Sequence, residues 1–192
     1  MRPMATVIGV VVIGRNEGQR LERCLVSLAH GADKVIYVDS GSTDGSLQLA
    51  ANLGVAVLAL DMSIPFTAAR ARNEGFAALQ RLLPSMQLVQ FVDGDCEVVS
   101  GWLEAAEQFF NAHPQHAVVC GRRRERFPEH SVYNRLCDME WNTPLGDAKA
   151  CGGDALMRAT ALVDAEGYLH MAWDHHGSKL RYAKSIETGS LQ

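Results

Sequence analysis

The chain has 192 residues, of which 47% are hydrophobic, 21% charged and 7% aromatic, and its 22 acidic and 18 basic side chains give a formal charge of −4. This composition is typical of a globular protein and excludes disordered, collagen-like and disulfide-dense classes. The acidic balance argues against nucleic acid as a partner, because binding its phosphates requires a basic face. We therefore expect a single folded domain over residues 1–192.

The five cysteines are odd in number, widely spaced and never arranged as C-x-x-C, which argues against a disulfide framework and a structural zinc site. The apolar stretch after Arg2 is short and lacks the small-residue cleavage pattern of a secretory signal, so a buried strand explains it better. No other apolar run approaches the ~18 residues of a membrane span. These features favour a cytoplasmic protein.

From the N-terminus, apolar runs typical of buried strands alternate with segments of helical periodicity. The expected order is strand 7–13, a helix carrying apolar residues from Leu21 to Leu28 and ending at Gly31, strand 34–38, helix 47–52, strand 55–60, helix 66–83, strand 88–92, helix 102–111 and strand 117–120. Such alternation predicts an α/β fold with a mostly parallel sheet flanked by helices. After Gly121 the pattern becomes irregular, which predicts an appended C-terminal subdomain.

In open α/β sheets, ligands bind beyond the carboxyl ends of the strands. Asp93-Gly94-Asp95 follows strand 88–92, and two carboxylates at this spacing can place one oxygen on Mg²⁺ or Mn²⁺ and another on a ribose hydroxyl or a metal-bound water. A cation held by one carboxylate completes its shell with phosphates and waters, which points to a diphosphate ligand. The alternative is a solvated turn, because Asp and Gly are common turn residues.

Two other polar segments are candidates for ligand binding. Asp39 ends strand 34–38 and can accept hydrogen bonds from a nucleobase or ribose, whereas Asp44 is expected to cap the next helix. Arg70 and Arg72 lie on different faces of a helix, so one can reach a ligand while the other meets solvent or an acidic side chain. The chain lacks G-x-G-x-x-G after the first strand, a P-loop and G-x-S-x-G, which weakens an NAD-dependent oxidoreductase.

Five segments in register, VVVIGRNE, VIYVDSGSTDGS, AARARNEG, FVDGDCEV with GWLE, and ACGGDALMR, resemble the family 2 glycosyltransferases. The resemblance runs from about residue 7 to residue 158 and implies the Rossmann-like GT-A fold of that family. It further implies a nucleotide-binding half at 1–120 and a shortened acceptor-side half at 121–192. The donor would be a UDP- or GDP-linked sugar, the cofactor Mg²⁺ or Mn²⁺, and the acceptor an unknown hydroxyl compound.

The resemblance also implies roles for individual residues. The nucleotide would be bound by Arg15, Asn16, Glu17, Asp39, Arg70, Arg72 and Asp93. The metal would be bound by Asp95, with His170 as a further ligand. The donor and acceptor pocket would be bordered by Trp141, Gly152, Gly153 and Asp154.

The chain departs from the family pattern after Arg158. In similar proteins a stretch such as GGF follows, and then an acidic pair that includes the general base, whereas here residues 162–170, LVDAEGYLH, come almost at once. No E-D or E-E pair follows Gly153, which leaves Asp154, Asp164, Glu166 and Asp174 as the acids that could substitute for the missing base. Asp154 lies in the best place by motif to take the acceptor hydroxyl proton.

Three functions stay open at this point. The first is a metal-dependent, inverting glycosyltransferase; the second is a catalytically impaired nucleotide-sugar binding paralogue or truncated form; the third is a nucleotidyltransferase, for which residues 14–18 are a poor phosphate loop. The basic block Arg122, Arg123, Arg124 and Arg126 can bind an anionic acceptor or a membrane surface, although a solvated strand exit is the favoured explanation. A lost segment would expose apolar surface that a partner, such as a second copy in a homo-oligomer, could cover.

Overall fold

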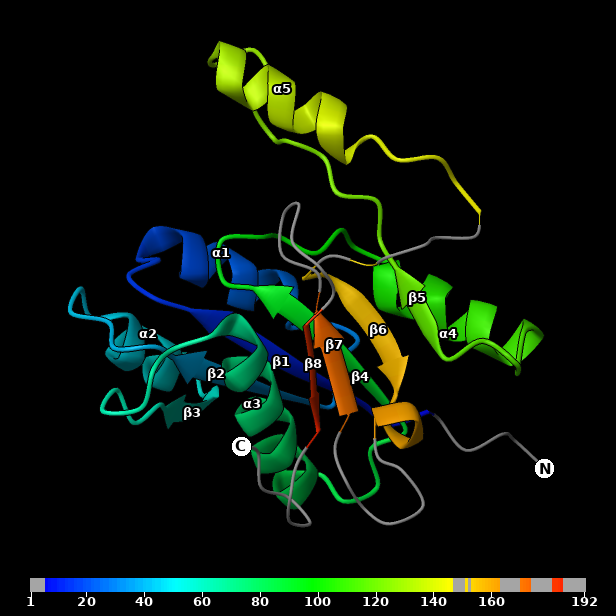
Figure 1. The fold of residues 1–192 in the computed structure, drawn as a ribbon, viewed down its shortest axis with the longest axis horizontal. Coiled ribbons are helices and arrows are strands. Elements are labelled where there is room, and N and C mark those ends of the chain that lie inside the picture. The colour runs from blue at the N-terminus through cyan, green and yellow to red at the C-terminus, as the bar shows by residue number, and fades with distance from the viewer. Residues whose placement is uncertain (1–5, 147–150, 152, 163–169, 174–180, 185–192) are drawn as a thin grey trace.

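The computed structural model describes residues 6–146, 151, 153–162, 170–173 and 181–184, and it is dominated by one six-stranded sheet (Figure 1). The strand order is β3-β2-β1-β4-β6-β5. The strands are β1 (Ile8–Gly14), β2 (Lys34–Asp39), β3 (Ala56–Ala59), β4 (Leu88–Asp93), β5 (Val118–Cys120) and β6 (Ala155–Arg158). A separate antiparallel pair is formed by β7 (His170–Trp173) and β8 (Arg181–Lys184).

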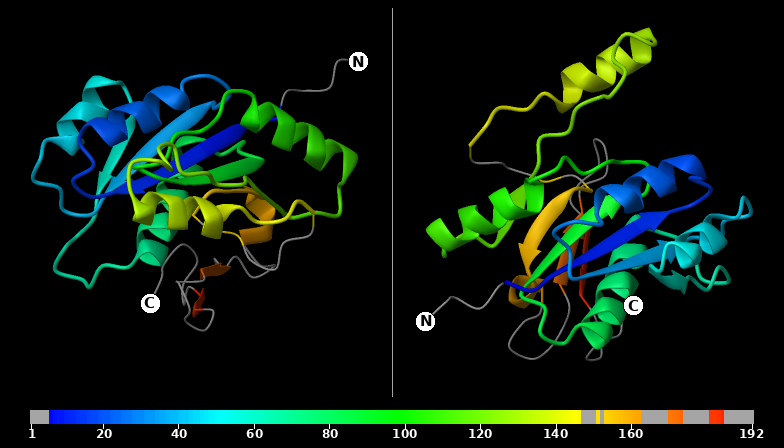
Figure 2. Two further views of the ribbon diagram at one scale, coloured as in Figure 1. Left: turned by 90° about the horizontal axis from the view of Figure 1, so that it is seen from above. Right: turned by 180° about the vertical axis from the view of Figure 1, so that it is seen from behind.

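Helices cover both faces of the sheet, with α3 on one face and α1, α2 and α4 on the other (Figure 2). The helices are α1 (Gln19–Ser27), α2 (Ser46–Asn52), α3 (Ala68–Leu82), α4 (Trp102–Ala112) and α5 (Val132–Trp141), and a 3₁₀ turn spans Ala159–Leu162. This arrangement makes β1 a strand with both faces buried, which explains its continuous apolar sequence.

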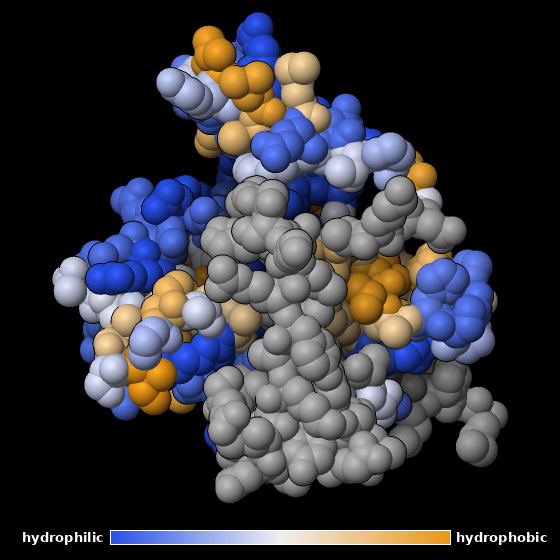
Figure 3. All heavy atoms as spheres, in the orientation of Figure 1, coloured by the Kyte–Doolittle hydropathy of each residue, from blue (hydrophilic) through white to orange (hydrophobic). Residues whose placement is uncertain are grey.

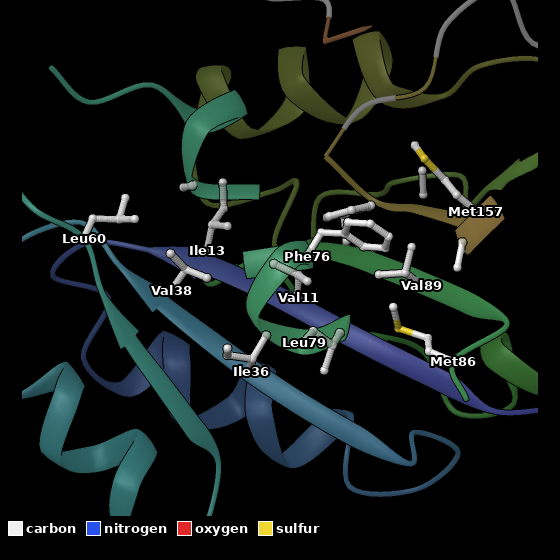
Figure 4. Packing of buried hydrophobic residues seen from close by; sticks show 14 residues of the cluster. Val11, Ile13, Ile36, Val38, Leu60, Phe76, Leu79, Met86, Val89 and Met157 are labelled. Atoms are coloured by element: carbon white, nitrogen blue, oxygen red, sulfur yellow. The ribbon is translucent and has the colours of Figure 1, made fainter. Parts of the chain in front are cut away.

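The core is divided between the two faces by the alternation of side chains along β1. On one face Val11 and Ile13 pack beneath Phe76 and Leu79 of α3 (Figure 4). On the other face Val10 and Val12 pack against α1 and α2. The helix α3 approaches the sheet closely at Gly75, because a Cβ atom there would lie 2.6 Å from a Val11 methyl and 2.7 Å from a Val38 methyl.

The observed topology confirms the predicted α/β class and the mostly parallel sheet. The pairs β1/β2, β1/β4 and β2/β3 are parallel, whereas β6 runs antiparallel to both β4 and β5. All nine elements expected up to residue 120 are present within a few residues of their predicted bounds. The first helix ends at Ser27, before the expected Gly31, because Leu28 and Ala29 close a tight turn on the carbonyls of Leu25 and Val26.

The irregular region after Gly121 contains elements that the sequence pattern did not predict: α5, β6, the 3₁₀ turn, β7 and β8. The helix α5 stands away from the sheet (Figure 1), and none of its residues is buried. Several of its apolar side chains are exposed, namely Val132 74%, Leu136 55% and Met139 68%, and orange spheres lie over α5 (Figure 3). No helix within the described residues is long and apolar enough to cross a membrane.

Candidate functional site

The polar residues singled out in the sequence meet at the edge of the sheet where β1, β2 and β4 end. In the parallel register Gly14 pairs with Asp39 and Ile13 with Asp93, so these two carboxylates flank the end of β1. Because β6 is antiparallel to β4, it begins at this same edge, with Ala155 beside Phe91. Residues 153 and 154 therefore come to lie beside the end of β4, although they are distant from it in sequence.

The turn after β1 is held in place by the turn after β2. Asn16 has a left-handed backbone with φ 56°, its N–H donates to Ser42 Oγ at 2.9 Å, and its side-chain oxygen accepts from the Thr43 N–H at 2.7 Å. Gly18 N–H donates to Ser46 Oγ at 3.3 Å. These bonds fix the shape of residues 15–17, on which the exposed Arg15 is presented to solvent.

Asp39 is 1% exposed and its carboxylate shapes the turn after β2. It accepts hydrogen bonds from the Tyr37 hydroxyl at 3.0 Å, the Gly41 N–H at 2.9 Å and the Ser42 N–H at 2.8 Å. Asp44 accepts from the Ser46 N–H at 3.0 Å and the Ser46 hydroxyl at 2.6 Å. The N-cap of α2 is Gly45, which has no side-chain cap hydrogen bond, so Asp44 binds the first helical residue from the turn before the helix and is not the expected cap. The Ser46 hydroxyl bond lowers the pKa of Asp44.

Arg72 and Asp93 form a close ion pair at the centre of the edge. Arg72 is 6% exposed, and its Nη2 lies 2.5 Å from Asp93 Oδ1. The backbone of Gly153 packs directly on this pair, since a Cβ atom there would lie 2.3 Å from Asp93 Oδ2 and 2.7 Å from Arg72 Nη2. Glycine is therefore the residue that allows the start of β6 to approach the end of β4.

Arg70 serves the fold of a neighbouring loop. Its Nε lies 2.6 Å from Glu74 Oε1, and its Nη1 donates to the carbonyls of Asp61 and Ile64, both at 3.0 Å. Of the two arginines near the start of α3, Arg72 is thus the one that meets the polar edge, and Arg70 connects α3 to the loop after β3.

Acidic side chains concentrate where a cation was expected. Asp95 is exposed on the turn after β4, and Glu17 lies near it with a raised pKa, caused mainly by burial and also by the negative charges of Asp95 and Asp44. Arg20, whose Nη2 is 2.8 Å from Glu17 Oε2, opposes this rise. Within the described residues no three His, Cys, Asp or Glu side chains are grouped to hold a metal by themselves, so a cation at Asp95 would need ligands from a bound molecule.

Two predicted site residues lie partly or wholly outside the described residues. His170 belongs to the backbone of β7, but its side chain lies outside the described part of the chain, and so does the whole of Gly152.

Asp154 lies in a partly enclosed position beside the Arg72–Asp93 pair. Its side chain is 23% exposed, and burial raises its pKa to about 6, with a further upward contribution from Asp93 and a downward one from Arg123. The wall around it includes Gly121 and Trp102, because a Cβ atom on Gly121 would lie 3.3 Å from Asp154 Oδ2 and 3.8 Å from the Trp102 ring. Trp102 is itself oriented by a 2.9 Å hydrogen bond from Nε1 to Gln90 Oε1.

Arg123 joins Asp154 to Trp141, which connects α5 to the polar edge. Its Nε lies 3.7 Å from Asp154 Oδ1, and its guanidinium carbon lies 5.2 Å from the centroid of the Trp141 ring. In the sequence Arg123 is distinguished only as part of a basic block, and Trp102 was not predicted as a site residue. Asp154 lies beside Arg123 and Trp102 because β6, which it precedes, runs antiparallel to β4.

The family described as Glycosyl transferase family 2 matches residues 9–155 of the chain, which include Asp39, Arg72, Asp93, Asp95 and Asp154. A TPR repeat-containing protein of Synechococcus elongatus is 28% identical over 138 residues, covering 71% of this chain and 32% of that protein.

Two solved structures have a similar fold. The mannosyltransferase PcManGT of Pyrobaculum calidifontis, in complex with GDP-Man and Mn²⁺, has a TM-score of 0.57 and 20% identity, covering 81% of this chain and 45% of its own. The glucosyl-3-phosphoglycerate synthase of Mycobacterium tuberculosis, in complex with Mn²⁺, UDP-glucose and glycerol 3-phosphate, has a TM-score of 0.54 and 21% identity. The match covers 82% of this chain and 58% of the synthase. These likenesses confirm the Rossmann-like GT-A fold. The chain spans between 32% and 58% of the lengths of the three relatives.

Proposed function

We propose a sugar-transfer function for this chain, which belongs to glycosyl transferase family 2. In this reaction an acceptor hydroxyl attacks the anomeric carbon of a nucleotide-diphospho-sugar, the nucleoside diphosphate leaves, and the configuration at that carbon is inverted. The observation that carries the proposal is the meeting of the Arg72–Asp93 pair, Asp95 and Asp154 at one edge of the sheet. A binding site for the donor and a carboxylate suited to proton transfer are thereby adjacent.

The turns after β1 and β2 provide the proposed nucleoside site. Their mutual hydrogen bonds make a rigid surface on which Arg15, Asn16 and Glu17 face the same edge as Asp39. Asp39 holds this surface in shape through the three hydrogen bonds that its buried carboxylate accepts, and we include it in the proposed nucleoside site. The complexes of the two structural relatives with GDP-Man and UDP-glucose support a GDP- or UDP-linked donor.

A divalent cation, Mg²⁺ or Mn²⁺, fits Asp95. The negative charges of Asp95 and Asp44 that help to raise the Glu17 pKa would be relieved by a cation at this place, and carboxylate oxygen suits both metals. With one protein carboxylate as ligand, the rest of the shell would come from the donor diphosphate and water, and we include His170 as a further candidate ligand. When bound, the cation would stabilise the charge on the departing diphosphate.

Asp154 is the proposed general base; it follows Gly153, which packs on the Arg72–Asp93 pair, and it is joined to Trp141 through Arg123. A pKa of about 6 leaves its carboxylate ionised at neutral pH and makes it more basic than an ordinary aspartate, which suits removal of a hydroxyl proton. Arg70 would contribute indirectly, because it holds the loop next to the nucleotide-binding arginine Arg72.

Calorimetric titration of UDP and GDP, with and without Mn²⁺, tests the donor site. We expect metal-dependent binding that Asp95→Ala abolishes, while Glu104→Ala, which removes an exposed acid from α4, leaves it unchanged. Release of nucleoside diphosphate from UDP-glucose and GDP-mannose then tests transfer to water or an acceptor, which Asp154→Asn should abolish without loss of nucleotide binding. Failure of both nucleotides to bind with Mn²⁺ would overturn the proposal, and binding without turnover would identify a nucleotide-sugar binding protein instead.

A further inference from the structure

Arg123 is distinguished from the other arginines of the basic block by what it contacts. Arg124 makes two 2.7 Å hydrogen bonds to the Asp138 carboxylate, and Arg126 is paired with Glu97. Arg124 and Arg126 are therefore each engaged with a nearby carboxylate of the protein. Arg123 instead extends to the polar edge of the sheet, where its side chain is 33% exposed between Asp154 and Trp141.

The contacts of Arg123 hold the plane of its guanidinium group in position and leave the N–H groups available as hydrogen-bond donors. The 3.7 Å separation from Asp154 is well beyond the roughly 2.7–2.9 Å of a charge-assisted hydrogen bond. The guanidinium lies over the Trp141 ring, a contact that orients it through its face and uses none of its five N–H groups. Within the described residues no hydrogen bond from these groups is formed, so a ligand can receive them without displacing a protein partner.

A planar guanidinium held in this way is suited to a carboxylate or phosphate group, because two parallel N–H groups match two anionic oxygens. The charges around Arg123 limit which ligand can bind there. Asp93 is already paired with Arg72, whereas the Asp154 carboxylate would repel an anion, and Arg123 is the cation beside Asp154 that can offset this repulsion. An acceptor bound through its anionic group to Arg123 would bring a hydroxyl on an adjacent carbon to the Asp154 carboxylate.

The arrangement also couples acceptor binding to the strength of the base. Arg123 lowers the pKa of Asp154 in the absence of a ligand. When an anion binds the guanidinium, Arg123 lowers the Asp154 pKa less, and the negative charge of the ligand raises that pKa further. The Asp154 carboxylate therefore becomes a stronger proton acceptor when the acceptor is present.

From these contacts we propose that Arg123 determines acceptor specificity and that the acceptor carries a carboxylate or phosphate group close to the hydroxyl that receives the sugar. The inference rests on the proposed sugar-transfer function, and it assigns to Trp141 the role of positioning Arg123.

Three probes of one carbon skeleton test this inference: glycerol, glycerate and glycerol phosphate, which are neutral, carboxylate-bearing and phosphate-bearing. Each is titrated against the full chain with Mn²⁺ and saturating UDP or GDP. We expect at least one charged probe to bind roughly 10- to 100-fold more tightly than glycerol, the range expected for hydrogen bonds to a charged group. The probe that responds identifies which anion the site prefers.

Matched variants distinguish recognition from general attraction. Arg123→Gln should reduce binding of the charged probe to the level of glycerol, whereas Arg122→Gln, which removes the same charge from an exposed neighbouring position, should leave it within about twofold. Arg123→Lys keeps the charge but not the two parallel N–H groups, so it should recover only part of the affinity. Thermal unfolding of each variant shows whether the fold is retained.

The inference is overturned if no charged probe binds better than glycerol, if Arg123→Gln keeps the preference, or if Arg122→Gln loses as much. Nucleotide titrations on the same samples separate this failure from that of the proposed function. Nucleotide binding with no preference for anionic probes contradicts the inference alone, whereas absence of nucleotide binding contradicts the proposed function itself.

Discussion

Replacement of Asp154 by asparagine is expected to stabilise the protein at neutral pH. The folded structure raises the pKa of Asp154 from 3.8 to about 6, mainly through burial, so the folded state holds a proton that the unfolded chain releases between these values. Stability therefore falls as the pH rises from about 4 to about 6, and the full cost of the buried charge is present above that range. Asparagine has the shape of the protonated acid and does not ionise.

The size of the effect follows from the same shift. At 1.36 kcal/mol per pKa unit, the ionised carboxylate destabilises the fold by about 3 kcal/mol at pH 7.5 and by about 1 kcal/mol at pH 4.5. The side chain is 23% exposed, so these values are upper estimates. Urea unfolding of wild type and Asp154→Asn at both pH values measures the difference. An equal difference at the two pH values, or a less stable variant at pH 7.5, would refute the reasoning.

Asp138→Asn provides a control of opposite sign. The hydrogen bonds from Arg124 lower the pKa of Asp138, so its ionised form stabilises the folded state above the pKa of the unfolded chain, and this contribution is lost as the pH falls. Asp138→Asn should therefore be less stable than wild type at pH 7.5, with the difference shrinking in acid. The two variants together separate the effect of burial from any general effect of removing a carboxylate.

Further substitutions test other parts of the site and fold. Gly153→Ala should displace the ion pair beneath it and weaken metal-dependent nucleotide binding roughly 5- to 150-fold, because overpacking of about 1–3 kcal/mol strains this pair; calorimetry measures the change in affinity. Gly75→Ala should cost about 1–3 kcal/mol in urea unfolding, since it meets two stiff valines, and Gly9→Ala should cost less, since it meets flexible Met and Leu side chains. In wild type, the rate of nucleoside diphosphate release from the sugar donor should rise tenfold for each unit that the pH increases up to about 6, because the Asp154 base must be ionised. Asp154→Asn should lack this pH dependence.

The sequence predicted the central sheet well because β1, β2 and β4 are buried on both faces. Their near-continuous apolar runs have no other common explanation in a chain of this composition. The polar residues directly after these runs could be assigned to one edge, because parallel strands all end on the same side. Asp44 was expected to cap α2, but the N-cap is Gly45, and Asp44 instead bonds Ser46 two residues away.

The acceptor side could not be predicted in the same way. The strand β6 has four residues and ends in Arg158, so its sequence carries no strong strand pattern. Its antiparallel pairing with β4 is a long-range choice, and only that pairing brings Gly153 onto Asp93 and Asp154 beside Trp102. Nothing local in the basic block distinguishes Arg123 from its neighbours, because the distinction lies in the distant partners Asp154 and Trp141.

The two carboxylates at the start of β6 and the end of β4 are each paired with an arginine, but with different tightness. Arg72 is nearly buried and lies 2.5 Å from Asp93, whereas Arg123 is partly exposed and lies 3.7 Å from Asp154. The close pair is covered by the Gly153 backbone and cannot rearrange without moving β6. The loose pair can change partner when a ligand arrives. The tighter pair therefore lies on the proposed donor side, where the diphosphate must be held in one geometry, and the looser pair on the proposed acceptor side, where a ligand that engages Arg123 would alter the basicity of Asp154.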